Sequence, residues 1–332
     1  MIRSQPKSAA ADDAYGILCR AYISAGQYQR FVATYREWAS AFPSSSQLRE
    51  QKDSVERFGG RPDQVNGPRR AATVRHDDNS FSVPVSINGK TDDFLLDTGA
   101  QHSLLTDREA KKFGLIVSGD IKIITGASGD TVTVRTAVAK VVTIGATSFR
   151  DVSFAVLEPT GPFGDAEAGI VGIPLLRGLG SIRWSKDGTV ELGRSTPQAR
   201  QDEPNLVFDR GLLLLKEEVL GKTVLMSLDT GATTSDLNAN FASRFPAVVE
   251  QGRKTTQDIT GVGGTRTFDA VELPEVRFAI GPARVLLRPA LVTLQRIAGI
   301  GGECCIGNAG LDLLAQGQTL SIDFSTMTLR LQ

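Results

Sequence analysis

The chain has 332 residues, 41% hydrophobic and 22% charged, which is ordinary for a soluble globular protein and long enough for two or three domains. Its 37 Lys and Arg balance 37 Asp and Glu, so no net field favours a nucleic acid, an anionic membrane or an acidic partner. No apolar run approaches the roughly 18 residues of a membrane span, and 34 glycines indicate a turn-rich β protein.

Residues 1–60 form the first predicted unit, in which apolar side chains recur at helical spacing. One helix ends at Gly26, a second runs from Tyr28 to Pro43, and a third follows Ser44 as far as Arg57. The first two resemble a single tetratricopeptide repeat, which cannot bury its own apolar face. We therefore expect these helices to dock on the rest of the chain or to continue an array. A packing role is favoured over the alternative, a module that binds a protein partner.

Residues 61–80 are rich in Gly, Pro, Arg, Asp and Asn and are predicted to be a linker. The next unit, residues 81–198, opens with period-two alternation up to Ile87. A hairpin turn at Asn88-Gly89 then leads to a second strand.

That strand, the apolar run Phe94-Leu95-Leu96, ends abruptly in a carboxylate followed by a hydroxyl and a glycine. Burying an isolated carboxylate costs several kcal/mol, so such a residue either has structural partners or serves function. The motif and the Gly-rich turn that follows it further along the chain comprise Asp97, Thr98, Gly99 and Ala100, then Gly126, Ala127, Ser128 and Gly129.

Residues 206–332 repeat this pattern in the same order. Asp229 follows Asp97 at an offset of 132 (229 − 97), and a second Gly-rich turn follows the first at an offset of 135 (261 − 126). The apolar-apolar-Gly sequence at 170–172 is echoed at 305–307, again at an offset of 135. Ordered markers with small drift indicate a duplicated domain, whose two Asp loops should meet at a pseudo-twofold axis. The second set comprises Asp229, Thr230, Gly231 and Ala232, then Gly261, Val262, Gly263 and Gly264.

These motifs, across about residues 80–332, resemble those of the aspartic protease family, and Ala after Asp-Thr-Gly is closer to its retropepsin-like branch. The resemblance implies a mainly β, bilobal aspartic-protease fold with pseudo-twofold symmetry, here with a short α-helical N-terminal region. It implies an aspartic endopeptidase that acts on an extended peptide or protein substrate, with Thr98 and Thr230 locking the two loops. The Gly-rich turns would be flaps over the peptide. Both acids lie in one chain, so we expect a monomer without a cofactor or metal.

The residue types fit this chemistry. Two carboxylates about 3 Å apart cannot both ionise, so they share a proton and hold a water that one of them activates as general base. Gly99 and Gly231 allow the backbone to come close beside the carboxylates.

Other interpretations stay open at this point. A buried Asp at a strand end can simply accept backbone N–H bonds in a tight turn, and the Gly-rich turns can be plain hairpin tips. The chain would then be a catalytically inactive peptide-binding or scaffold protein. With only His76 and His102, a histidine triad or a zinc site is disfavoured. We expect His102 to be a solvated loop residue.

Residues 1–6 contain no apolar segment typical of a signal peptide. The sequence therefore leaves the compartment unknown: periplasmic or secreted if a leader has been removed, and cytoplasmic otherwise.

Overall fold

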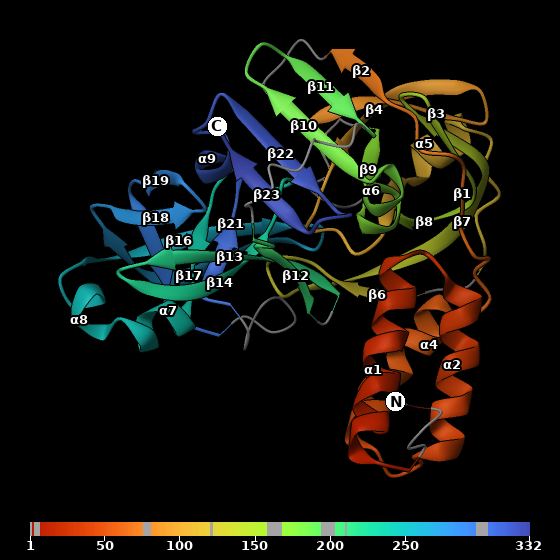
Figure 1. Cartoon of the computed structure of the whole chain (residues 1–332), viewed down its shortest axis with the longest axis horizontal. Helices are drawn as coiled ribbons and strands as arrows, with labels where there is room; N and C mark the ends of the chain where they lie inside the picture. The colour runs from red at the N-terminus through yellow and green to blue at the C-terminus, as the bar shows by residue number, and fades with distance from the viewer. Residues whose placement is uncertain are drawn as a thin grey trace.

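The computed structural model describes residues 2, 7–75, 81–119, 122–157, 168–193, 203–209, 211–296 and 305–332. The chain is mainly β, as predicted, with two β lobes joined through a third sheet and a group of N-terminal helices against the first lobe (Figure 1). No helix in these ranges is long and apolar enough to cross a membrane.

The N-terminal helices form a small unit with its own aromatic core. Ser8 and Ser45 cap the first and third helices, because their hydroxyls accept backbone N–H groups three residues on. Trp38, Phe31 and Phe58 are fully buried between the helices. The predicted third helix is in fact two, because the chain turns at Gln51. The helices are α1 (Ala9–Ser24), α2 (Tyr28–Ala41), α3 (Ser46–Glu50) and α4 (Lys52–Phe58).

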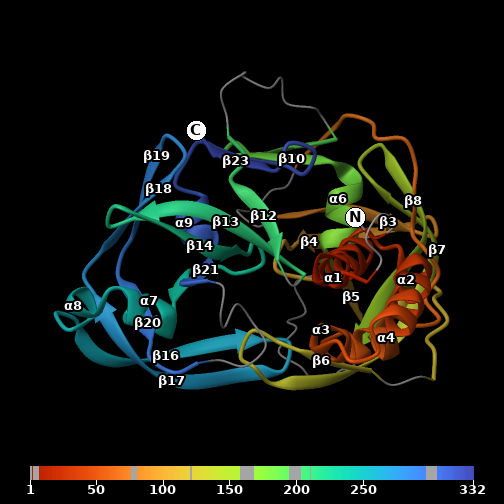
Figure 2. The same ribbon diagram turned by 60° about the horizontal axis from the view of Figure 1, so that its bottom comes forward.

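This helical unit docks on the first lobe. The Arg177 guanidinium donates to the Ser24 hydroxyl at 2.7 Å. Gln64, just after the helices, bridges the two parts: its backbone N–H donates to the Gly26 carbonyl at 2.8 Å and its side-chain amide to the Pro174 carbonyl at 3.0 Å. The helices approach the lobe where α1 lies beside α6 and α4 beside β6 (Figure 2). These contacts support the packing role, whereas binding of a protein partner stays a prediction.

The first lobe is an eight-stranded sheet in the order β1-β8-β5-β9-β4-β3-β7-β6, in which β7 also pairs with β8. Its inward side chains, among them Val83, Val85 and Ile87, are fully buried. The elements are β1 (Val65–Asn66), β3 (Ser82–Ile87), β4 (Lys90–Leu96), β5 (Ser103–Thr106), α5 (Asp107–Lys112), β6 (Lys122–Thr125), β7 (Thr131–Ile144), β8 (Thr147–Leu157), β9 (Gly169–Val171) and α6 (Ile173–Leu179).

The second lobe repeats the arrangement around the Asp motif. Strand β4 pairs in parallel with β9, as β14 does with β21. Strand β5 pairs antiparallel with β9, as β15 does with β21. The elements are β12 (Leu206–Asp209), β13 (Leu212–Val219), β14 (Lys222–Leu228), β15 (Asp236–Leu237), α7 (Ala239–Arg244), α8 (Pro246–Val249), β16 (Arg253–Gly261), β17 (Gly264–Leu273), β18 (Val276–Ile280), β19 (Ala283–Leu287), β20 (Ala290–Thr293), β21 (Gly307–Ala309) and α9 (Leu311–Leu314).

The register of these strands corrects one predicted match between the repeats. Leu96 pairs with Val171, and its counterpart Leu228 pairs with Ala309. The glycine that precedes α6, Gly172, therefore corresponds to Gly310 before α9 and not to Gly307. The offset of 135 was wrong here, because a few extra residues precede β21.

A third sheet joins the lobes. Strand β10 of the first repeat pairs with β22 of the second, Ser181 opposite Asp323, and one apolar core runs through both lobes. The predicted lobes 81–198 and 206–332 therefore do not have wholly separate sheets. This sheet, in the order β2-β11-β10-β22-β23, contains β2 (Ala72–Arg75), β10 (Ser181–Ser185), β11 (Thr189–Leu192), β22 (Thr319–Asp323) and β23 (Thr328–Leu331).

The predicted linker 61–80 also requires correction. Its described part contains two strands: β1 pairs with β8, and β2 adds to the edge of the joining sheet beside β11. Arg61 within it is buried and lies over the Phe58 ring at 5.2 Å. Between irregular segments, the backbone of this region satisfies its hydrogen bonds by extending existing sheets.

Candidate active site

The two Asp motifs occupy equivalent positions at the ends of paired strands. Asp97 follows β4 and Asp229 follows β14, and each backbone N–H donates to the neighbouring parallel strand at 3.0 Å, to Val171 and Ala309 respectively. Both carboxylates are thus delivered to the junction between the lobes.

Each carboxylate is held by its own loop. The Oδ1 atom of Asp97 accepts the backbone N–H groups of Gly99 at 2.7 Å and Ala100 at 3.1 Å. In the second lobe, Oδ1 of Asp229 accepts the corresponding groups of Gly231 at 2.9 Å and Ala232 at 3.1 Å. These bonds fix the orientation of both side chains and leave the Oδ2 atoms for other partners.

The two threonines lock the loops across the pseudo-twofold axis, as the resemblance implied. The Thr98 hydroxyl donates to the Leu228 carbonyl at 2.8 Å and accepts the Thr230 N–H at 3.0 Å. Reciprocally, the Thr230 hydroxyl donates to the Leu96 carbonyl at 2.6 Å and accepts the Thr98 N–H at 3.1 Å. Both threonines are almost wholly buried, so this network fixes one loop against the other.

The glycines let each loop lie against the opposite carboxyl group. A Cβ atom on Gly99 would lie 2.7 Å from Asp229 Cγ, and one on Gly231 would lie 2.5 Å from Asp97 Cγ. Neither position can hold a larger residue unless the carboxylates move.

Burial and a neighbouring charge strongly affect the Asp97 carboxyl group. Burial, then the charge of Asp229, raises the pKa of Asp97 well above its ordinary value. The Asp229 Oδ2 atom accepts a hydrogen bond from the side-chain amide of Asn308 at 3.0 Å. Sequence reasoning missed Asn308, because the mistaken offset of 135 hid its place beside Asp229.

The two predicted flaps meet at their tips. The first turn, 126–129, joins β6 to β7, and the second, at 262–263, joins β16 to β17. A Cβ atom on Gly126 would lie 3.1 Å from the Gly263 backbone nitrogen, and Arg266 donates to the Ser128 carbonyl at 3.5 Å. The flap strands β6, β16 and β17 lie together along one side in Figure 2.

The expectation that His102 is solvated was wrong. Its side chain is buried and meets the Phe58 ring edge-on, with centroids 5.8 Å apart. The loop after Asp97 is therefore supported by the N-terminal helices, which sequence spacing could not show. His76 lies outside the described residues. Within the described ranges, no group of three or more His, Cys, Asp or Glu side chains is arranged to hold a metal ion.

Part of the chain matches a known protein family. Residues 83–175 match the family model described as aspartyl protease. This match includes Asp97 and its loop, so the first lobe is similar to aspartyl proteases. No curated protein sequence matches the chain. Among solved structures, the chain is similar to the crystal structure of a retropepsin-like aspartic protease from Rickettsia conorii. Identity is 22%, coverage is 39% of this chain and 91% of that chain, and the TM-score is 0.27.

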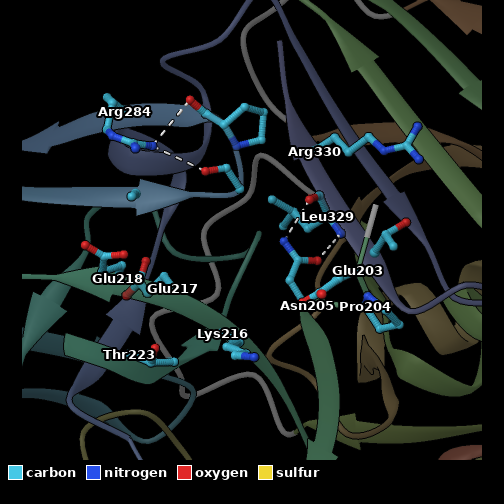
Figure 3. Close-up of a pocket in the computed structure, with 14 residues that line it drawn as sticks. Glu203, Pro204, Asn205, Lys216, Glu217, Glu218, Thr223, Arg284, Leu329 and Arg330 are labelled. Atoms are coloured by element: carbon cyan, nitrogen blue, oxygen red, sulfur yellow. Dashed lines mark hydrogen bonds between the residues drawn. The ribbon is translucent and has the colours of Figure 1, made fainter. Parts of the chain in front are cut away.

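A pocket of about 450 Å³ lies away from the dyad, between β13, the β18–β19 hairpin and β23 (Figure 3). Glu217 lines it, yet this residue is only 3% exposed. Neither of its carboxylate oxygens has a hydrogen-bond partner among the described residues. Burial raises the pKa of Glu217 to about 8, because the ionised carboxylate is poorly solvated there.

For the peptidase activity that the family resemblance implies, changing Gly99 to Ala should lower kcat/KM by roughly 100-fold or more, since displacements of about 1 Å near reacting groups have such effects. The added methyl group would collide with the Asp229 carboxyl group. Gly119→Ala is the matched control, because a Cβ atom there meets open space. Steady-state kinetics and thermal unfolding of both variants test this; equal activities would show that the close approach is unimportant.

Proposed function

We propose that the chain is an aspartic endopeptidase that hydrolyses peptide bonds within an extended polypeptide. The observation that carries the proposal is the pair of carboxylates held in matching loops and locked by reciprocal threonine hydrogen bonds. A structural Asp at a turn would need only its own backbone N–H groups. Two such loops fixed face to face are what a shared-proton dyad requires.

The two acids would divide the work. The Asp229 carboxyl group, whose Oδ2 accepts the Asn308 amide, would act as the general base. It would remove a proton from a water held between the acids as that water attacks the scissile carbonyl carbon. Asp97, whose pKa is raised, would hold the shared proton and donate it toward the carbonyl oxygen. The protons belong to the coupled pair, so the roles describe the dominant arrangement.

The flaps would cover the peptide. Extended backbone between two hairpins can pair with both, and closure of the tips excludes bulk water from the dyad. The contact between Arg266 and the Ser128 carbonyl supports such a closed arrangement.

Incubation with a diverse peptide library, followed by mass spectrometry of the products, tests the proposal. We expect internal cleavage, inhibition by a pepstatin-type transition-state analogue, and activity per molecule that does not fall on dilution to nanomolar concentration. Constant activity follows because both acids lie in one chain. Peptide binding without any cleavage would instead favour the inactive binding protein, and a second-order loss on dilution would contradict the monomer.

A further inference from the structure

The two sides of the dyad differ in polarity at matched positions. In the first lobe, Leu95 pairs with Ile170, which in turn pairs with Leu104. The corresponding strands of the second lobe align Ser227, Asn308 and Asp236 in the same register. Residues paired in this way point to the same face of a sheet. Leu95, Ile170 and Leu104 are called the apolar row. Ser227, Asn308 and Asp236 are called the polar row.

The apolar row is continuous with the flaps. Its three residues belong to one hydrophobic cluster with Ile124 of the first flap and Val262 at the tip of the second. A substrate side chain bound beside Asp97 would therefore contact the apolar row on one side and the apolar flap residues on the other. Such a surface favours a larger aliphatic or aromatic side chain by roughly 10- to 200-fold in kcat/KM.

The polar row forms a hydrogen-bonded chain that ends on the dyad. The Ser227 hydroxyl donates to Asn308 Oδ1 at 2.6 Å, and Asn308 Nδ2 donates to Asp229 Oδ2 at 3.0 Å. Next to this row, the Thr293 hydroxyl donates to the Gln257 side chain of the second flap at 3.0 Å. An apolar side chain placed here would bury polar groups without offering them a partner.

Asp236 is the member of the polar row whose hydrogen-bonding capacity is unused. It pairs with Asn308 and is partly exposed, and no described residue donates a hydrogen bond to its carboxylate or forms an ion pair with it. The charged groups that act on it are Asp229 and Asp312, both acidic. Burial, and then these two charges, raise the pKa of Asp236 to about 7. A cation bound here would relieve this repulsion and favour the ionised carboxylate.

Resting on the proposed function, we propose that this protein selects peptides with an apolar residue on one side of the scissile bond and Lys or Arg on the other. A peptide that crosses the dyad near the pseudo-twofold axis presents its two flanking residues to opposite lobes. One then lies on the apolar row and the other reaches Asp236. Asp236 is thus a specificity-determining residue that touches the substrate.

The test uses peptides that keep an apolar residue on one side of the bond and carry Arg, Gln, Leu or Glu on the other, in both orientations. In one orientation, we expect kcat/KM for Arg to exceed that for Gln by about tenfold or more, since a charged pair excluded from water is worth at least about 1.4 kcal/mol. Asp236→Asn should remove this preference, and Asp236→Leu, which introduces the residue found at 104, should turn it toward Leu. Glu250→Gln, an exposed acid elsewhere on the second lobe, is the control and should keep the wild-type ratios.

Binding of the same peptides to Asp97→Asn, measured by calorimetry, separates selection from catalysis. If Asp236→Asn cleaves these peptides with the same ratio of kcat/KM for Arg over Gln as wild type, the proposed subsite is wrong, whereas the proposed endopeptidase function still holds. Arg-selective binding that depends on Asp236, without cleavage by wild type, would support the subsite and overturn the proposed function. Wild-type preference for apolar residues on both sides, or no binding and no cleavage of any peptide, would overturn the subsite.

Discussion

Replacing either Asp97 or Asp229 by Asn should lower kcat/KM for peptide hydrolysis by at least about 10³-fold, since each loss removes a group that moves a proton in the transition state. The fold should survive, because the amide oxygen of Asn can still accept the two backbone N–H groups that now bind Oδ1. An amide can neither ionise nor share the proton, so neither variant should work through the remaining acid.

Steady-state kinetics on one cleaved peptide, with circular dichroism and thermal unfolding to check the fold, measures this effect. Asp187→Asn is the matched control, because Asp187 also accepts a backbone N–H group, that of Thr189 at 2.9 Å, but lies in an exposed turn. Its activity should equal that of wild type. Turnover within tenfold of wild type in either dyad variant would rule out the shared-proton mechanism.

The sequence predicted the general plan because the plan depends on local and repeated signals. An apolar strand that ends in Asp-Thr-Gly is readable in each half, and the spacing of 132 between Asp97 and Asp229 identifies the repeat. The mainly β, bilobal fold followed from these features.

What the sequence did not reveal depends on contacts between distant segments. The burial of His102 requires Phe58, and β2 exists only because β11 offers an edge for pairing. No local pattern records either partner. The short strands of the predicted linker were hidden among turn residues for the same reason.

The polar row was only partly hidden. Ser227 and Asp236 are both at the offset of 132 from the apolar residue that they replace (227 − 95 and 236 − 104), so a position-by-position comparison of the repeats would have exposed both. Asn308 could not be found in this way, because its offset from its counterpart Ile170 is 138 (308 − 170) and only the strand register aligns them.

The same comparison singles out Glu217, which is at the offset of 132 from Val85 (217 − 85). Both residues are buried and lie on the first strand of the hairpin that leads to the Asp motif. A carboxyl group replaces a buried valine, and burial raises its pKa from 4.5 to about 8. This substitution should make the stability of the fold depend on pH in a predictable direction.

The folded state holds the Glu217 proton more tightly than the unfolded state does. Between pH 4.5 and about 8, the unfolded chain has already released this proton while the folded chain keeps it, so stability falls as pH rises through this range. Above about pH 8 the loss from this group is complete, and its size is on the order of 5 kcal/mol at about 1.4 kcal/mol per pKa unit.

Glu217→Val, which restores the residue of the first lobe, should therefore raise the free energy of unfolding by several kcal/mol at pH 9 and much less at pH 5. Urea unfolding at pH 5, 7 and 9 measures the difference between the two proteins. Glu218→Gln, an exposed neighbour on the same strand, is the control and should follow the wild-type pH dependence. A gain for Glu217→Val that is the same at all three pH values would mean that packing in the core, and not the ionisation of this carboxyl group, limits the stability of the second lobe.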